Sequence, residues 1–268
     1  MLRIHICVSP VRFPIQTLAC IWGRHESSVS TYIDEWAVKW GEAGEDLSVL
    51  DITADFLEET YPERYKQGGL LKVCALPDGK DFMINTPRAN TIITRAAWSD
   101  KVRKYFRLAA IAAQLTSWCI SCLKVHNSAV RCISWSTATG LSFEHTDLFF
   151  ARVSEKRLVE LWGPRLRKCP RGWSMLADRG FAGTAHYYPN FNAQLTPKFL
   201  AARSQFTGAE VAGDYELCKL RYTCEVAFAR VTVEAGLKDV VPYSFFSIID
   251  AMNHWGHANV NLMAPLCK

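Results

Sequence analysis

The sequence lacks several features that would assign it to a specialised class of protein. Its net charge is only +5, so it has no strong basic excess of the kind found in proteins that coat DNA. Its ten cysteines follow no framework spacing, and charged residues and prolines interrupt any secretory signal near the first residue. We therefore expect reduced thiols in an intracellular protein.

Long apolar runs are also missing. Residues 108–123 carry no charge, but this run has 16 residues and includes Gln, Thr and Ser, whereas a membrane span needs roughly 20 apolar residues. We expect a buried or half-buried helix there and no membrane partner.

The sequence does contain enough apolar material for a globular core. Hydrophobic residues make up 49% of the 268 positions and charged residues 21%, which excludes wholesale disorder. Nine tryptophans supply large aromatic surfaces that need a core or a partner. The length suggests one domain with an appendage, or two small domains.

Two helices joined by a turn are predicted near the N-terminus. Residues 15–22 are rich in apolar side chains, and a turn at 23–26 follows. In the next helix, which Ser27 or Ser28 would cap, the apolar positions from Val29 to Trp36 step by four and three. Its exposed side then carries Arg24, His25, Ser27, Ser28 and Thr31. This pattern is typical of a DNA-reading helix-turn-helix, although many helical hairpins share it.

The rest of the chain alternates between strand-like and helix-like segments. After an acidic helical stretch over 47–65, a strand, or a strand pair over 72–76 and 82–84, is expected, with Asp78 at a bend. The later elements are a hairpin over 130–135 and 141–150 with its turn at 137–140, a helix over 155–162, a strand over 173–177 and a long helix over 215–237. This order predicts an α/β domain.

Three acidic residues are candidates for chemistry. The pattern puts Asp78 and Asp178 at strand ends, and Glu225 lies inside an otherwise apolar and basic helix. A carboxylate is costly to bury unless it has a partner or binds a metal ion. Pattern alone favours a salt bridge between Glu225 and Arg221, four residues earlier, over a metal site.

These acids lie in stretches that match a known family in order. The stretches are Asp78-Gly79-Lys80, Trp98-Ser99-Asp100-Lys101, Thr139-Gly140, residues 151–156 (ARVSEK), residues 176–181 (LADRGF), residues 197–211 and residues 221–230. Over about residues 15–262, the chain resembles the DDE superfamily endonucleases of Harbinger-like transposases. The A-D-R-G-F box, with its aspartate 47 residues before Glu225, is the most specific part of the resemblance.

The resemblance implies a fold and a reaction. The fold is an RNase H-like core, a mixed sheet flanked by helices, with residues 1–68 as a helix-turn-helix DNA-binding segment and 69–268 as the endonuclease domain. Asp78, Asp178 and Glu225 would be the catalytic residues. They would hold two Mg²⁺ ions, or Mn²⁺ ions, about 4 Å apart that clamp a phosphodiester.

The resemblance also implies partners. Double-stranded DNA, both transposon ends and target, would be the substrate of a nuclear homo-oligomer, with an accessory DNA-binding protein among its partners. The candidate DNA contacts are Arg24, Ser27, Ser28, Thr31, Arg179, Arg221 and Arg230. For the last three, structural salt bridges are the alternative role.

The sequence departs from the family in several places. Lys80 stands where Thr is common, and Thr223 and Val226 replace the usual His and Arg around Glu225. Asp81 is an alternative first acid. The largest departure is the 23-residue segment 103–125, which we interpret as an in-frame insertion such as a retained intron, because Lys-Val stands at 101–102 and again at 124–125.

Other functions stay open at this point. One is a domesticated or inactivated transposase-derived protein that binds DNA without catalysis, and another is a copy broken by the insertion. A zinc site formed by His254 and His257 with Cys119 and Cys122 is not favoured, because 132 residues separate Cys122 from His254.

Overall fold

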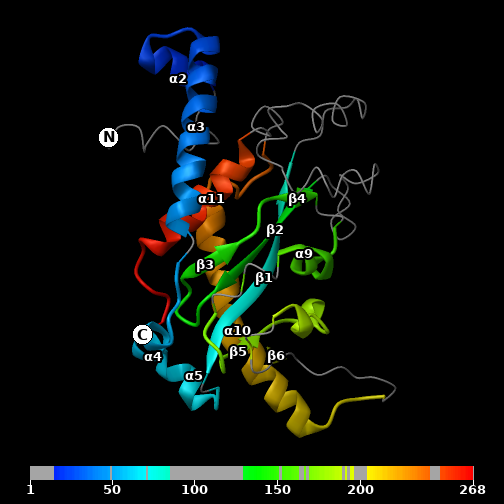
Figure 1. Cartoon of the computed structure of the whole chain (residues 1–268). Coiled ribbons are helices and arrows are strands. Elements are labelled where there is room, and N and C mark those ends of the chain that lie inside the picture. Colours follow the sequence, from blue (N-terminus) through cyan, green and yellow to red (C-terminus); the bar gives the residue numbers. More distant parts are fainter. Residues whose placement is uncertain are drawn as a thin grey trace.

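The structure, a computed structural model, is a mixed β-sheet with helices on both faces and a pair of helices at the N-terminal end (Figure 1). It describes residues 15–48, 50–70, 72–84, 129–150, 153–162, 166, 169–188, 191, 194–195, 204–241 and 248–267. The predicted α/β class is confirmed. The proposed insertion at 103–125 lies outside the described residues.

The sheet combines antiparallel and parallel pairing. Its strands are β1 (Val73–Met83), β2 (Ala129–Ser136), β3 (Ser142–His145), β4 (Phe149–Phe150), β5 (Ser174–Leu176) and β6 (Gln194–Leu195). The strand order is β3-β2-β1-β5-β6, and β4 also pairs with β2. The pairs β1–β2 and β2–β3 are antiparallel, whereas β5 runs parallel to both β1 and β6.

Strand β1 is continuous, so the predicted bend at Asp78 is wrong. Asp78 pairs with Ser134 in the middle of the ladder between β1 and β2. The preceding Pro77 cannot donate a backbone hydrogen bond, but β5 pairs with β1 only as far as Ala75. Beyond that point the described strands leave one side of β1 unpaired, and a proline is tolerated in such a place. Asp78 therefore projects from the body of a strand and not from its end.

The predicted hairpin is confirmed, with one interruption. The turn between β2 and β3 closes with a hydrogen bond from Gly140 N to Thr137 O of 2.9 Å, and Gly140 has the positive φ of 85° that favours glycine. The second expected strand, 141–150, is split into β3 and β4. Between them, Leu148 N donates to Asp250 Oδ1 at 2.9 Å instead of continuing a strand ladder.

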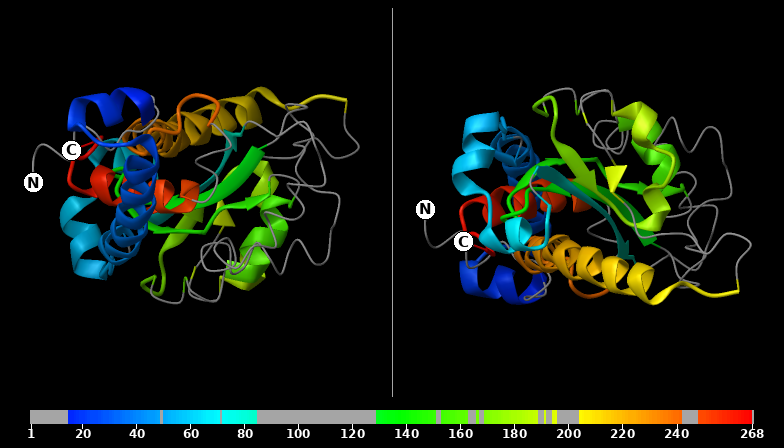
Figure 2. Two further views of the ribbon diagram at one scale, coloured as in Figure 1. Left: turned by 90° about the horizontal axis from the view of Figure 1, so that it is seen from above. Right: turned by 90° about the horizontal axis from the view of Figure 1, so that it is seen from below.

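Helices cover both faces of the sheet. Helix α9 (Glu155–Trp162), which has the bounds expected from the sequence, lies on one face, and α10 (Gly208–Glu234) crosses the other (Figure 2). Helix α10 begins earlier than expected because Thr207 and Glu210 form a reciprocal capping box at its start. Helix α11 (Ile249–Asn261) packs against α10 and the edge strand β3.

The N-terminal helices are α2 (Ile15–Trp22) and α3 (Glu26–Ser48). Their first part projects beyond the sheet, whereas the second half of α3 packs on α11 (Figure 1). The two helices approach closely there, since a Cβ atom on Gly41 would lie 2.6 Å from Ala251 Cβ. The rings of Trp40 and Trp255 meet edge to face at 4.3 Å across the same contact.

Two short helices, α4 (Ala54–Thr60) and α5 (Glu63–Gln67), lead into the sheet. Their Leu57 and Tyr65 belong to the same buried cluster as the strand residues. Residues on both sides of position 68 therefore share one core. The predicted boundary between a DNA-binding segment (1–68) and an endonuclease domain (69–268) stays a prediction.

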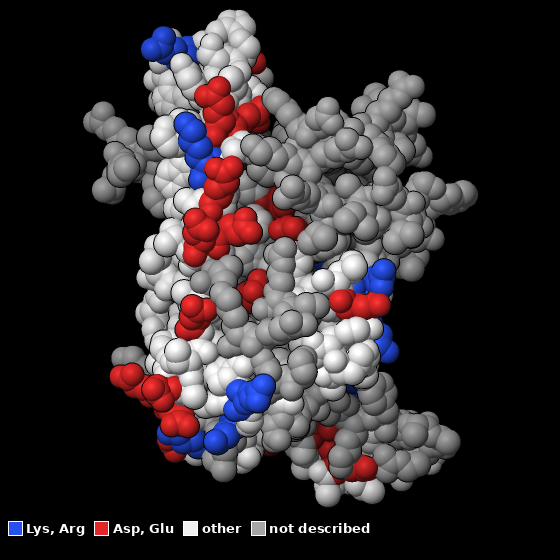
Figure 3. All heavy atoms as spheres, viewed as in Figure 1, with Lys and Arg blue, Asp and Glu red and all other residues white. Residues whose placement is uncertain are grey.

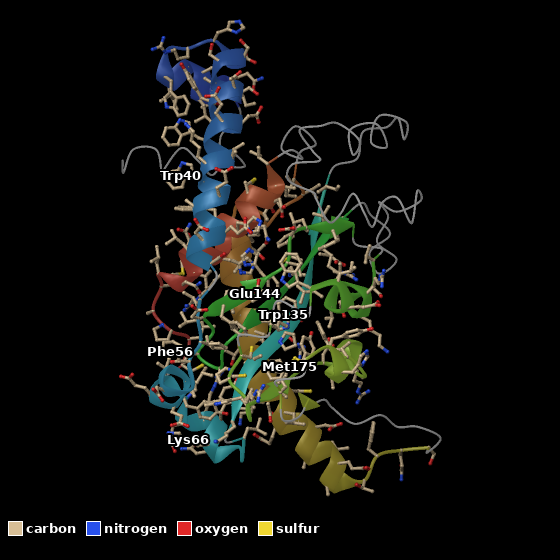
Figure 4. All side chains as sticks on the ribbon, in the orientation of Figure 1. Trp40, Phe56, Lys66, Trp135, Glu144 and Met175 are labelled. Carbon is tan, nitrogen blue, oxygen red and sulfur yellow. The ribbon has the colours of Figure 1, made fainter. Side chains whose placement is uncertain are left out.

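The buried interior is mainly aromatic and aliphatic, but polar and charged side chains are also buried. Trp135 of β2, opposite Glu144 of β3, and Met175 of β5 lie in the sheet (Figure 4). Glu144 is buried and accepts a hydrogen bond of 3.2 Å from the indole of Trp162 on α9. None of the described helices combines the length and apolar character needed to cross a membrane.

Candidate active site

The first candidate acid, Asp78, points from β1 toward α10. Its side chain is 17% exposed, and its Oδ1 lies 3.4 Å from Nη1 of Arg221 on α10. Alternation along a strand sends the next residue, Gly79, to the opposite face, which α9 covers. The position of Asp78 within β1 thus decides which helix its carboxylate meets.

The second candidate acid, Asp178, follows β5. It caps the 3₁₀ helix η2 (Arg179–Phe181), where its Oδ1 accepts a hydrogen bond of 2.7 Å from Gly180 N. Because β5 runs parallel to β1 and beside it, the chain leaves β5 close to the middle of β1. The residues of the A-D-R-G-F box therefore form a tight turn that fixes the direction of the Asp178 carboxylate.

The third candidate acid, Glu225, lies on α10, one turn after Arg221. The predicted salt bridge between them is confirmed, with Arg221 Nη2 at 2.7 Å from Glu225 Oε1. The same guanidinium reaches Asp78 through its other terminal nitrogen. From the sequence, the salt bridge and the metal site were alternative roles for Glu225. In the structure, the salt-bridged Arg221 also contacts Asp78, another of the three candidate acids.

Electrostatic coupling links all three carboxylates. Burial raises the pKa of Asp78 to about 6, the negative charges of Asp178 and Glu225 add to this rise, and Arg221 partly offsets it. Burial alone would lower the pKa of Arg221, but neighbouring Cys224 and the three acids raise it. These influences indicate that the three carboxylates lie near one another, although the Glu225 side chain is 47% exposed.

The site thus gathers three oxygen-ligand side chains from a strand, a post-strand turn and a helix around one cation. Carboxylate oxygens are the ligands that Mg²⁺ and Mn²⁺ prefer. Among the described residues, however, the three acids do not form a group whose ligand atoms all lie within 4.8 Å of one another, and Arg221 pairs with Asp78 and Glu225, so metal binding here stays a prediction.

Sequence reasoning missed a fourth acid, Glu155, at the start of α9. A Cβ atom on Gly180 would lie 2.5 Å from Glu155 Oε2 and 3.0 Å from Asp178 Oδ1, so the two carboxylates border the same small space. A Cβ atom on Gly79 would lie 2.8 Å from Glu155 Oε1. The signal was a glycine one residue after Asp78 and another two residues after Asp178, because both glycines make room for the Glu155 side chain.

The alternative first acid, Asp81, lies apart from this cluster. Its two carboxylate oxygens accept hydrogen bonds from Arg131 Nε at 2.6 Å and from Arg131 Nη2 at 2.9 Å. An odd-numbered position also sends its side chain to the opposite face of β1 from Asp78. Asp81 is thus one partner of a bidentate ion pair.

Three of the four arginines predicted to contact DNA have structural partners. Arg179 lies 3.7 Å from Asp214, and Arg230 Nη1 donates to Ala264 O at 2.7 Å. Arg221 belongs to the carboxylate cluster. Contacts of these residues with phosphate stay a prediction.

The predicted helix-turn-helix residues lie at the tip of the α2–α3 pair. Arg24, Ser27 and Thr31 are exposed and Ser28 is partly buried. Helix α3 begins at Glu26, so neither serine precedes it as a cap. Its only basic residue is Lys39, whereas acidic side chains follow its length (Figure 3); they are Glu26, Asp34, Glu35, Glu42, Glu45 and Asp46. DNA binding by this pair stays a prediction, and Arg24 is the cation best placed at its tip.

No family model, curated protein or solved structure matches this chain.

Proposed function

We propose that the chain is a divalent-metal-dependent DNA endonuclease and strand transferase of the DDE superfamily, similar to Harbinger-like transposases. The observation that carries the proposal is that Arg221 contacts both Asp78 and Glu225, while Asp178 lies in the turn after β5, the strand that runs parallel to β1 and beside it. These three residues come from positions 78, 178 and 225, so no local sequence constraint brings them together. Three carboxylates on separate elements are suited to a pair of hard cations.

The topology supports the finer fold assignment, an RNase H-like core. Three antiparallel strands are followed by two parallel ones, with a helix on each face. In such a core the first acid lies on the first strand, the second follows a later parallel strand, and the third lies on the next helix. Strand β1, the turn after β5 and helix α10 supply these positions in that order.

The chemistry assigned to each residue follows from its position. Asp78, Asp178 and Glu225 would hold two Mg²⁺ ions, which activate the attacking water or 3′-OH and stabilise the leaving oxygen. Asp178 is oriented by Gly180 N before any ion binds. Asp78, with a pKa of about 6, changes to its ligating form as the pH rises through that value. Arg221 holds Asp78 and Glu225 in place through its two terminal nitrogens.

One observation favours a second candidate function, DNA binding without catalysis. Arg221 is an internal counter-ion to Asp78 and Glu225, so the metal-free cluster is already partly neutralised. A descendant of an enzyme could keep this arrangement for stability alone. The two functions differ in one measurable property, metal-dependent cleavage.

The test is nicking of supercoiled plasmid DNA by the full chain in Mg²⁺ or Mn²⁺. Asp178→Asn and Glu225→Gln should each lower the rate by about 100-fold or more, because the ions supply several kcal/mol of transition-state stabilisation. Glu216→Gln is the matched control, since Glu216 is an exposed acid on the same helix that pairs only with Lys219 among the ion pairs described. It should cleave like the unmodified chain.

Equal cleavage by Asp178→Asn and the unmodified chain would overturn the proposed site. Salt-dependent DNA binding with no cleavage in either metal would instead favour the non-catalytic function. Circular dichroism of each variant separates loss of chemistry from loss of fold.

A further inference from the structure

A second group of metal-ligating side chains lies among the described residues, and it includes none of the three candidate catalytic acids. Asp147 comes from the loop between β3 and β4, Asp250 from the first turn of α11, and His254 from the next turn. One ligand atom from each residue lies within 4.8 Å of the other two. His254 Nε2 is 3.5 Å from Asp147 Oδ1 and 3.8 Å from Asp250 Oδ1.

These separations suit a single ion. Ligand atoms held at about 2.0–2.1 Å from a tetrahedral zinc ion are about 3.4 Å apart. The two nitrogen-to-oxygen distances at His254 exceed that value by only a few tenths of an ångström. A small contraction would therefore give an N,O,O site with a fourth position for water.

Burial makes an uncompensated charge on Asp147, Asp250 and His254 energetically unfavourable. The side chains of Asp250, His254 and Asp147 are 3%, 10% and 18% exposed. Two carboxylates face one imidazole, so the group carries excess negative charge unless a proton or a cation neutralises it. Buried carboxylates without compensation are strongly disfavoured.

Neighbouring residues orient the three ligands. Asp250 Oδ1 accepts a hydrogen bond of 2.9 Å from Leu148 N. His254 Nδ1 lies 2.6 Å from His145 Nε2, and the His145 ring stacks on His257 at 4.0 Å. Such outer hydrogen bonds are typical of metal-binding histidines, because they fix the tautomer.

The ring nitrogen of His145 that carries the proton determines the tautomer of His254. The His145 ring is buried and lies against the rings of both His254 and His257. Its buried Nδ1 has no hydrogen-bond partner. A His145 tautomer that carries its proton on Nδ1 can accept the Nδ1–H of His254 at its Nε2. This leaves the Nε2 of His254, which faces both carboxylates, as the lone-pair nitrogen that a metal ion requires.

We propose that Asp147, Asp250 and His254 bind one Zn²⁺ ion that ties helix α11 to the loop between β3 and β4. Zinc accepts both imidazole and carboxylate ligands, and a site with three protein ligands leaves the fourth position to water. This site differs from the zinc pairing considered from the sequence, since His257 faces Ser142 Oγ at 2.7 Å and Cys119 and Cys122 lie outside the described residues.

The competing occupant is a proton. Burial alone would lower the pKa of His254, but the hydrogen bond to Asp147 and the charges of both carboxylates raise it. An imidazolium held between two carboxylates would satisfy the same group without a metal. The experiment must therefore measure metal binding directly.

The test uses the full chain carrying Asp178→Asn and Glu225→Gln, which weakens binding at the proposed catalytic site. After dialysis against chelator, Zn²⁺ is titrated by calorimetry and Co²⁺ by visible absorption. We expect one equivalent of Zn²⁺ and the intense spectrum of tetrahedral Co²⁺. Adding Asp147→Asn or His254→Gln should weaken binding by about 10-fold or more. His186→Gln, at an exposed histidine, is the control and should bind like the parent.

Absence of Zn²⁺ binding in the parent would overturn the proposal, as would unchanged binding in both ligand variants. Should those variants unfold, the parent spectrum still decides, because an octahedral Co²⁺ spectrum contradicts the proposed site. The proposal does not depend on DNA cleavage, so failure of one leaves the other intact.

Discussion

Arg221 joins two acids that lie on different layers of the molecule. Its Nη1 is 3.4 Å from Asp78 Oδ1 on the sheet, and its Nη2 is 2.7 Å from Glu225 Oε1 on its own helix. The arginine does not fully compensate Asp78, because burial and two neighbouring acids still raise the pKa of that carboxyl to about 6. The ionised form of Asp78 therefore destabilises the folded, metal-free protein, and this effect can be measured.

Asp78→Asn should stabilise the metal-free protein at neutral pH. The folded state holds the Asp78 proton more tightly than the unfolded chain, so the contribution of Asp78 to stability falls as the pH rises from about 4 to about 6. A pKa rise of roughly two units corresponds to about 3 kcal/mol. Urea unfolding without metal at pH 5 and pH 7.5 should show that the free energy of unfolding of the variant, relative to that of the unmodified chain, is greater at pH 7.5 than at pH 5. An equal difference at both pH values would contradict this account.

Asp81→Asn should destabilise the folded protein. It leaves Arg131, whose side chain is only 8% exposed, without its bidentate partner. Removing one member of a buried ion pair costs about 3 kcal/mol or more. Thermal unfolding should show a lower midpoint at pH 7.5, whereas plasmid nicking per folded molecule at low temperature should be unchanged. A specific loss of nicking with normal stability would make Asp81 a catalytic candidate again.

Glu155→Gln should lower metal-dependent nicking by about 10-fold, the lower end of what outer partners of metal ligands contribute. The reason is the position of its carboxylate beside Asp178 Oδ1, within the space that Gly180 leaves free. The matched control is Glu160→Gln on the same helix, since Glu160 pairs with Arg157 at an exposed position. If the two variants nick at the same rate, Glu155 has no role at the site.

Gly41→Ala should destabilise the junction between α3 and α11. The added methyl group would meet Ala251 Cβ at 2.6 Å, and relief of such overpacking costs about 1–3 kcal/mol. Gly213→Ala is the control, because a Cβ atom there has no neighbour within 4 Å and alanine favours a helix by up to about 1 kcal/mol. Differential scanning calorimetry should give midpoints that move in opposite directions, and a shared direction would count against the described packing.

Local pattern was sufficient for several helices and strands. The bounds of α9 followed from Leu158 and Trp162 on one face, and the β2–β3 hairpin from its glycine turn. The sequence left open whether β1 is one strand or two, because Pro77 and Gly79 disfavour a strand locally and only the long ladder with β2 stabilises it.

Long-range relationships account for what the sequence did not reveal. The contact between Arg221 and Asp78 joins residues 143 positions apart, and nothing in either segment specifies it. The proximity of Glu155 to Asp178 depends on how α9 meets the turn after β5, and the group of Asp147, Asp250 and His254 on how α11 meets the sheet. Each of these is a property of packing between elements and not of one segment.

The pairing of Asp78 with Ser134 makes the length of the chain before Asp78 a functional constraint. Strand side chains alternate between faces, so a shift of one residue would turn Asp78 toward α9 and set Gly79 beneath Arg221. Single-residue insertions or deletions between Val73 and Pro77 should thus abolish the site even where every acid is retained. A second change that restores the number of residues before Asp78 should restore the site. The pairing register of β1 with β2 therefore determines the site, whereas the composition of the strand does not.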